Sequence, residues 1–239
     1  MAIFHIRETT STNDLLREAQ YREGDVVWAD YQTAGRGQRG HKWSSDAGAN
    51  LLFSVALEPA FLPVAEQFLL SETVALSLMD LLADYGIPTR IKWTNDIYAG
   101  DRKIVGILIE HIYSGAHLAK TIVGIGLNVN QREFDPALPN PTSMALQTGR
   151  EYDLREVLEH FVARLMYNYE QLRQGAKQRI QERYVASMYR RGTQHVYALP
   201  DGTRFRGTIA GVRPSGELII DREDGTRAEY LFKEVEFVL

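Results

Sequence analysis

A glycine-rich loop between two strand-like runs is the feature that most limits how this chain can fold. Residues 32–43, Gln-Thr-Ala-Gly-Arg-Gly-Gln-Arg-Gly-His-Lys-Trp, follow one apolar run and precede another at residues 50–57. Gly35, Gly37 and Gly40 form the G-x-G-x-x-G pattern of dinucleotide-binding folds, but that pattern requires a helix directly after the loop. A polar turn and a strand-like run follow instead, so the sequence disfavours a dinucleotide-binding fold.

The residue types in the loop suit a phosphate or another small anion. Glycine lets backbone N–H groups approach an anion closely, Arg36 and Arg39 offer forked donors, and the Trp43 indole offers a face to a base or ring. The chain has a formal net charge of -4, which argues against a surface built for nucleic acid. We therefore expect a local cationic pocket for a small anion.

Composition narrows the class of protein further. A chain of 239 residues with 44% hydrophobic content can bury a large core and fits one large domain with a small companion. It has no cysteine, which excludes disulfides and thiolate metal sites. No signal segment opens the chain, and no apolar run approaches the ~18 residues of a membrane span. We expect a cytoplasmic protein with no membrane association.

Hydrophobic periodicity predicts an α+β fold. Strand-like runs, the last three forming an antiparallel meander, are expected at residues 2–8, 25–31, 50–57, 91–98, 103–113 and 118–130. Helical spacing is found at residues 64–85 and 153–190, with a break at Gly175. We predict a mixed, largely antiparallel sheet flanked by helices over residues 1–190.

The pattern changes after Gly192. Residues 191–239 show short β-rich runs separated by strong turn signals, which predicts a small C-terminal β-barrel packed on the larger domain. Its apolar side chains, Phe232 among them, are expected to form its core rather than to touch a ligand.

Two short clusters carry possible chemistry besides the loop. Ser11, Thr12 and Asn13 fit a helix N-cap, and the same position can also bind a polar ligand group at the positive helix end. A strand at residues 103–110 begins with Lys103, whose side chain faces either solvent or a partly desolvated site. A hairpin brings Asp96 near it, which would suit a magnesium ligand beside a phosphate-binding cation.

Glycines within the expected strands favour a site over a solvent-facing surface. Gly106 interrupts one apolar strand, and Gly124 and Gly126 interrupt the next, just before Asn128. A glycine inside a strand weakens packing and is often found where a ligand or another backbone comes close. These two strands therefore expose a face stripped of side chains.

Together these segments resemble the biotin protein ligases, which attach biotin to the carrier domain of biotin-dependent carboxylases. The resemblance covers the whole chain and rests on the Ser-Thr-Asn opening, the Gln-Thr glycine loop with its tryptophan, the Lys-Trp-x-Asn-Asp block, residues 103–110, residues 124–128 and the small C-terminal barrel. It implies a catalytic domain related to class II aminoacyl-tRNA synthetases and a Src-homology-like barrel. Because Ser-Thr-Asn begins at residue 11, we expect no N-terminal DNA-binding domain and no DNA binding.

The resemblance also implies an AMP-forming ligase that uses biotin, ATP and Mg²⁺. Biotin and ATP give biotinyl-5'-adenylate and pyrophosphate, and a lysine of the biotin carboxyl carrier protein then takes the biotin and expels AMP. The expected catalytic cations are Lys103, Arg36 and Arg39, and the expected metal ligand is Asp96. Residues expected at biotin are Ser11, Thr12, Gln32, Gly35, Arg36, Lys103, Gly106, Gly124 and Gly126. Residues expected at the nucleotide are Arg36, Arg39, Trp43, Asn95, Lys103 and Asn128. The protein is expected to be a monomer or homodimer.

The loop is also expected to act as a lid that keeps water from the reactive adenylate. Gln38 stands where many family members have arginine, and His41 stands where another basic residue is common, so retention of the adenylate is expected to be looser or to depend on Arg39. Thr94 replaces a frequent proline, a change expected to be mild.

Two alternatives differ in class. A lipoate ligase shares the fold and the chemistry but has a glycine-triplet loop followed by histidine, which this sequence lacks. A non-catalytic ligand sensor would keep the pocket without turnover, and Lys103, Asp96 and the two arginines argue against it.

Overall fold

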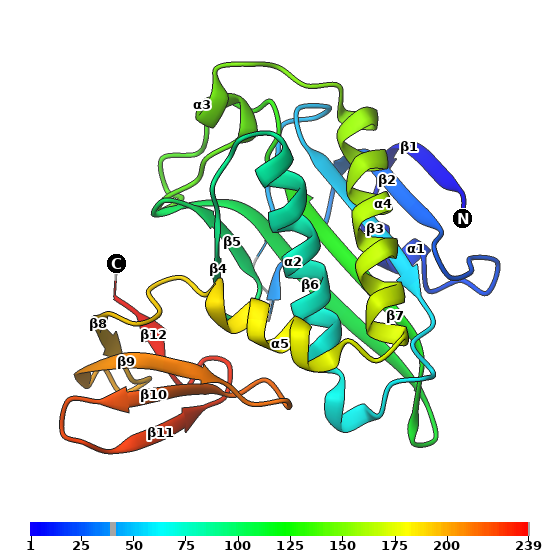
Figure 1. Cartoon of the computed structure of the whole chain (residues 1–239). Helices are drawn as coiled ribbons and strands as arrows, with labels where there is room; N and C mark the ends of the chain where they lie inside the picture. Colours follow the sequence, from blue (N-terminus) through cyan, green and yellow to red (C-terminus); the bar gives the residue numbers. More distant parts are fainter. Residues whose placement is uncertain (39–41, 239) are drawn as a thin grey trace.

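The computed structural model describes residues 1–38 and 42–238, and a seven-stranded sheet with a second, smaller sheet gives the chain its frame (Figure 1). Arg39 and His41 therefore lie outside the described residues. The large sheet has the strand order β1-β2-β3-β7-β6-β5-β4. Its strands are β1 Ile3–Thr9, β2 Val26–Gln32, β3 Leu51–Leu57, β4 Arg90–Lys92, β5 Asp96–Ala99, β6 Arg102–Ser114 and β7 His117–Leu127. Only β1 and β2 pair in parallel among these strands, which confirms the largely antiparallel sheet.

Two longer helices, α2 (Phe68–Asp84) and α4 (Leu154–Arg173), pack on the large sheet, and a third, α5 (Lys177–Ala186), packs against α2. Figure 1 shows α2 and α4 side by side across the sheet. Asp153 starts α4 by accepting a hydrogen bond from the backbone N–H of Glu156, and Gly175, at φ +94°, marks the expected break before α5. No helix in the described ranges is long and apolar enough to cross a membrane.

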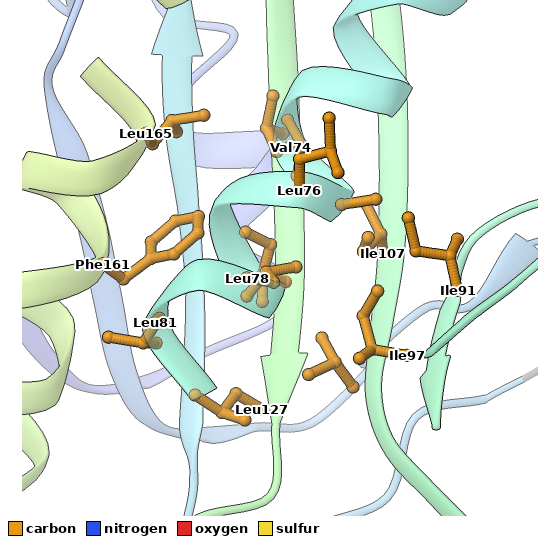
Figure 2. Close-up of a cluster of buried hydrophobic side chains, with 14 of the residues drawn as sticks. Val74, Leu76, Leu78, Leu81, Ile91, Ile97, Ile107, Leu127, Phe161 and Leu165 are labelled. Carbon is orange, nitrogen blue, oxygen red and sulfur yellow. The ribbon is translucent and has the colours of Figure 1, made fainter. Parts of the chain in front are cut away.

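The main core lies between these helices and one face of the sheet. Figure 2 shows Val74, Leu78 and Leu81 of α2 beside Phe161 and Leu165 of α4, with strand residues facing them. All five side chains are at most 1% exposed. Burying one such side chain stabilises the fold by roughly 1.5–3 kcal/mol, so this face determines how the helices are placed.

The opposite face of the sheet has a much smaller apolar cover. Successive strand residues point to opposite faces, so Val27 and Ala56 turn away from the main core and form a second cluster with Leu16 and Ile122. That cluster lies under the short helix α1 (Thr12–Leu15). The rest of this face, where the strand glycines lie, is left open for the site.

The C-terminal strands form a five-stranded antiparallel sheet with the order β11-β10-β9-β8-β12, as the small β-rich unit expected after residue 190. Its strands are β8 Gln194–Ala198, β9 Arg204–Val212, β10 Leu218–Arg222, β11 Arg227–Tyr230 and β12 Glu236–Phe237. The Trp93 Nε1–H donates to the Gly216 carbonyl over 2.9 Å, and Trp93 also packs edge-on against Phe232. These contacts attach the small sheet beside the β4–β5 turn.

Two local expectations need correction. The run at residues 91–98 is two strands, because the turn at residues 93–95 separates β4 from β5. The helix at Ser11 is only four residues long, and the Ser11 side chain caps nothing. The reason is that the polar side chains after Ser11 bond to the sheet instead, as described below.

Glu72 is an acidic side chain buried within α2. It is 2% exposed, and its Oε2 has no hydrogen-bond partner among the described residues. Burial raises the pKa of Glu72 to about 8, because the ionised carboxylate loses its hydration. The folded protein therefore holds a proton that the unfolded chain, with a carboxyl pKa near 4.5, has released at neutral pH.

We predict that Glu72→Gln makes unfolding less sensitive to pH. Proton binding by Glu72 stabilises the folded protein. Between pH 5.5 and 7.5 this contribution to the free energy of unfolding falls by ~1.4 kcal/mol per pH unit as the pH rises. The variant should therefore gain ~3 kcal/mol in free energy of unfolding, relative to the parent, across this interval. Urea unfolding of both proteins at the two pH values measures this difference.

Comparison with the parent is needed because His111, whose pKa burial lowers, contributes the opposite pH slope in both proteins. The exposed Glu159→Gln is the matched control and should show no such gain. Equal pH dependence in the Glu72 variant and the parent would mean that Glu72 is solvated in solution.

Candidate functional site

A cavity of about 280 Å³ lies where α1, the glycine loop, the β4–β5 turn and the strand glycines meet. Most residues expected at the site surround it. These are Ser11, Thr12, Gln32, Arg36, Trp43, Asn95, Asp96, Lys103, Gly106, Gly124 and Gly126. Because these residues line one cavity, they support a single site built from segments that lie far apart in the sequence.

The three strand glycines form the floor of the cavity. Gly106 of β6 and Gly126 of β7 are register partners, and the Trp43 indole lies directly on both. A Cβ atom built on Gly126 would be 2.3 Å from Trp43 Cε2, and one on Gly106 would be 2.5 Å from Cζ3. At Gly124 a Cβ atom would be 2.3 Å from Asn13 Oδ1. Only glycine leaves room for these two side chains.

A hydrogen-bonded polar cluster closes one end of the cavity. The Thr12 backbone N–H donates to Gln32 Oε1 over 2.8 Å, and the Thr12 hydroxyl lies 2.7 Å from Ser54 Oγ. Ser54 Oγ donates to Asn13 Oδ1, and Asn13 Nδ2 donates to Glu110 Oε2 over 2.7 Å. Because buried polar groups keep fixed positions when they are bonded to one another, this end presents an ordered set of donors and acceptors.

Lys103 and Asp96 form an ion pair in the middle of the cavity, as the hairpin predicts. Lys103 Nζ lies 2.7 Å from Asp96 Oδ1, although the angles fall outside the hydrogen-bonding range and Oδ1 is otherwise buried without a partner among the described residues. Lys103 Nζ is also 5.5 Å from the centre of the Trp43 ring. The carboxylate and the ring face both attract the ammonium and hold it in the cavity. Asn95 Nδ2 nearby donates to the Ile107 carbonyl over 2.8 Å.

Carboxylates also hold Arg36. Its Nη2 donates to Asp14 Oδ1 over 2.7 Å and to Glu110 Oε2 over 3.4 Å. A β-bridge between Arg36 and Lys42 joins the two described ends of the loop. In this arrangement the guanidinium stays at the rim of the cavity, where an incoming anion competes with the two carboxylates for it.

Two expected residues have other roles in the structure. Gly35 is outside the cavity lining, and its carbonyl accepts a hydrogen bond from the Trp43 backbone N–H over 3.0 Å. Asn128 is also outside the lining, because its side chain is buried and donates to the Thr142 carbonyl over 2.9 Å. Arg39 lies outside the described residues and has no geometry to compare.

Sequence reasoning missed several side chains of the cavity lining and of the polar cluster beside it. Ser54 lies inside an apolar run and gives no signal, whereas Asn13 belongs to the Ser-Thr-Asn cluster and Glu110 ends the Lys103 strand. Lys92, from the Lys-Trp block, also lines the cavity. Phe232 packs against the core, as expected, and lines the cavity as well.

Whether these residues could hold a magnesium ion depends on the number of protein ligands that the ion requires. Within residues 1–38 and 42–238 there is no cluster of three or more His, Cys, Asp or Glu side chains that could hold a metal. Mg²⁺ at nucleotide sites is usually held by one or two carboxylates together with substrate phosphates and water. The half-buried Asp96 carboxylate at the cavity fits that mode of binding.

Comparison with known proteins decides the family. A family model described as the biotin/lipoate A/B protein ligase family matches residues 4–128. The "Biotin--[acetyl-CoA-carboxylase] ligase" of Paracoccus denitrificans is 31% identical over 226 residues, which cover 90% of this chain and 92% of that protein. The chain belongs to the biotin/lipoate A/B protein ligase family. This confirms the family expected from the sequence motifs.

Two further relatives define how far the likeness extends. The "Bifunctional ligase/repressor BirA" of Escherichia coli is 34% identical over 148 residues, which cover 62% of this chain and only 46% of that protein. The chain thus spans about half the length of this curated relative. A solved biotin protein ligase from Aquifex aeolicus, in complex with biotin and ATP, superposes with a TM-score of 0.83 at 29% identity, covering 99% of both chains. The fold class expected from the sequence is confirmed.

We predict that Gly126→Ala disrupts the seat of Trp43. The added Cβ would lie 2.3 Å from the indole, and the rigid strand leaves the ring no alternative but to move with its loop. The near-ultraviolet circular dichroism of tryptophan should change. Gly211→Ala in β9 is the matched control, because its Cβ would meet only Val185 at 4.0 Å. An unchanged spectrum in Gly126→Ala would contradict the contact.

Proposed function

We propose that this chain is a biotin protein ligase, which activates biotin with ATP to biotinyl-5'-adenylate and transfers biotin to a lysine of a biotin carboxyl carrier protein. The observation that carries the proposal is the order of groups in one cavity. A fixed polar cluster lies at one end, a glycine floor follows, and the Lys103–Asp96 pair lies beyond it. Such an order suits a polar ring, an aliphatic chain and an acid group that meets a phosphate.

In this proposal the polar cluster binds the ureido ring of biotin. Ser11, Thr12 and Gln32 supply donors and acceptors, and the Gly124 and Gly126 backbone lies beneath the chain that leads to the carboxylate. Because these polar groups are buried or half-buried, a ligand that left them unpaired would lose affinity. Selectivity for biotin over lipoate, which lacks a ureido ring, follows from this end of the cavity.

Lys103 and Arg36 assist the first step by attracting two anions that repel each other. The biotin carboxylate attacks the α-phosphorus of ATP, and the ammonium of Lys103 sits where both anions approach. Arg36 exchanges Asp14 and Glu110 for phosphate oxygens, and Arg39 stays a predicted partner of the same phosphates. Asp96 is the residue that would hold Mg²⁺, which supplies charge neutralisation on the phosphates when bound.

Trp43 and Asn95 are proposed to lie at the nucleotide, and the glycine loop is proposed to close over it. The adenylate is a mixed anhydride, so exclusion of water by this loop protects it until the carrier lysine attacks its acyl carbon and AMP leaves. Asn128 is proposed to act only indirectly, by fixing the backbone after β7.

The remaining assignments rest on the printed names of relatives and on the sequence. We propose residues 1–190 as the catalytic domain, residues 191–239 as a small C-terminal domain, and an acetyl-CoA carboxylase carrier domain as the partner. We also propose a cytoplasmic location, as expected from the sequence. Monomer or homodimer, and absence of DNA binding, stay predictions.

The test is to incubate the protein with biotin, Mg-ATP and a carrier domain, and to measure AMP and a biotin-sized mass gain on the carrier. Biotin bound without AMP or mass gain would favour a ligand sensor and overturn the proposal. Turnover with lipoate in place of biotin would point to a lipoate ligase.

We predict that Lys103→Ala slows adenylate formation roughly tenfold to a few hundredfold, because a charge-assisted contact contributes ~1.5–3 kcal/mol. Arg102→Ala, one residue earlier on β6 and exposed, is the matched control and should keep normal turnover. The rate of AMP formation and the thermal midpoint are measured for both variants. Near-normal turnover in Lys103→Ala would remove Lys103 from the mechanism.

A further inference from the structure

Lys92 is a cation at the cavity that forms no ion pair with a carboxylate within the described part of the chain. It lines the cavity from β4, the edge strand next to β5. The ion pairs between described residues include Lys103 and Arg36 but not Lys92. Aromatic rings hold it instead, with Nζ 5.1 Å from the centre of the Tyr98 ring and 5.5 Å from that of Phe237. A ring face attracts the ammonium without cancelling its charge, so the charge stays available to an anion.

Lys92 stands at one end of a row that crosses four strands. Lys92 pairs with Asp96, Asp96 with Gly106, and Gly106 with Gly126. Residues opposite each other in a sheet point to the same face, so the Lys92 side chain emerges on the face that carries Trp43. Strands lie ~4.8 Å apart, which puts Lys92 about 10 Å from the glycine floor.

The polar cluster lies on the other side of that floor. Gln32 and Ser54 come from β2 and β3, which are separated from β4 by β7, β6 and β5. The Lys103–Asp96 pair lies between the two ends. An acid group bound from the polar end therefore approaches a phosphate at Lys103 from the side opposite Lys92.

Phosphoryl transfer proceeds with the attacking and leaving oxygens roughly in line. When a carboxylate oxygen forms its bond to the α-phosphorus, the bond from that phosphorus to the bridging oxygen breaks, and the electron pair stays on pyrophosphate. The leaving group thus gains negative charge on the side away from the carboxylate. That side of the cavity is the β4 side, where Lys92 lies.

We infer that Lys92 is a further catalytic residue, which binds the pyrophosphate leaving group during adenylate formation. The inference rests on the proposed ligase function. It gives the two lysines different roles. Lys103 binds the carboxylate and the α-phosphate that react, and Lys92 stabilises the pyrophosphate that leaves.

The experiment compares Lys92→Met, which keeps an unbranched apolar stem and removes the charge, with Lys92→Arg, which restores a cation able to bind phosphate. Arg90→Ala is the matched control, because Arg90 lies two residues earlier on β4, is exposed and is outside the cavity lining. Three quantities are measured: biotin-dependent exchange of pyrophosphate into ATP, biotin affinity, and transfer to the carrier from preformed biotinyl-5'-adenylate.

We expect Lys92→Met to slow the exchange and raise the KM for pyrophosphate by roughly tenfold to a hundredfold. Biotin affinity and transfer from the preformed adenylate should stay within about twofold of the parent, since neither step involves pyrophosphate. Lys92→Arg should recover part of the exchange, and Arg90→Ala should behave as the parent.

Normal exchange in Lys92→Met would overturn the inference. Equal losses in exchange and in transfer would also overturn it, because they would indicate a general structural role. Absence of exchange in the parent protein would instead overturn the proposed function, so the two failures are distinguishable.

Discussion

Contact between the Trp43 indole and the bare backbones of Gly106 and Gly126 is the constraint on which the site depends. A flat ring can lie on a sheet only where neighbouring strands both lack side chains at that point, and register makes these two glycines partners. The same contact fixes the end of the glycine loop, since the Trp43 backbone is bonded to Gly35. Loop, floor and aromatic wall are therefore one packed unit, and a side chain added at the floor alters all three.

The charges of the site are balanced within the protein before any anion arrives. Asp96 holds Lys103, and Asp14 with Glu110 holds Arg36. Carboxylates hold these cations in place at the cavity, but they also compete with a substrate for them. Lys92 differs, because aromatic rings place it without competing for its charge. In the proposed ligase, the reacting anions must displace a carboxylate from Lys103 or Arg36. The pyrophosphate that leaves can bind Lys92 without displacing one.

The small C-terminal sheet belongs to the site as well as to the fold. Phe232 lines the cavity, Phe237 lies under Lys92, and Gly216 accepts the Trp93 indole hydrogen bond. All three contacts meet the Lys-Trp dipeptide or its surroundings. Ile91 of β4 already exchanges backbone hydrogen bonds with Ser187 and Tyr189, and the C-terminal sheet adds to this support of the hairpin that presents Lys92 and Asp96.

Sequence by itself determined what depends on neighbours along the chain. Periodicity gave the order of strands and helices, hairpin geometry brought Asp96 to Lys103, and the missing helix after the glycine loop excluded the dinucleotide fold. Tertiary structure decided what depends on register between distant strands. Asn13 meets Glu110 across 97 positions, Ser54 turns from an apolar run into the polar cluster, and Phe232 reaches the cavity while it packs against the core. Such pairings arise from how sheet and helices pack as a whole, and no local pattern in the sequence encodes them.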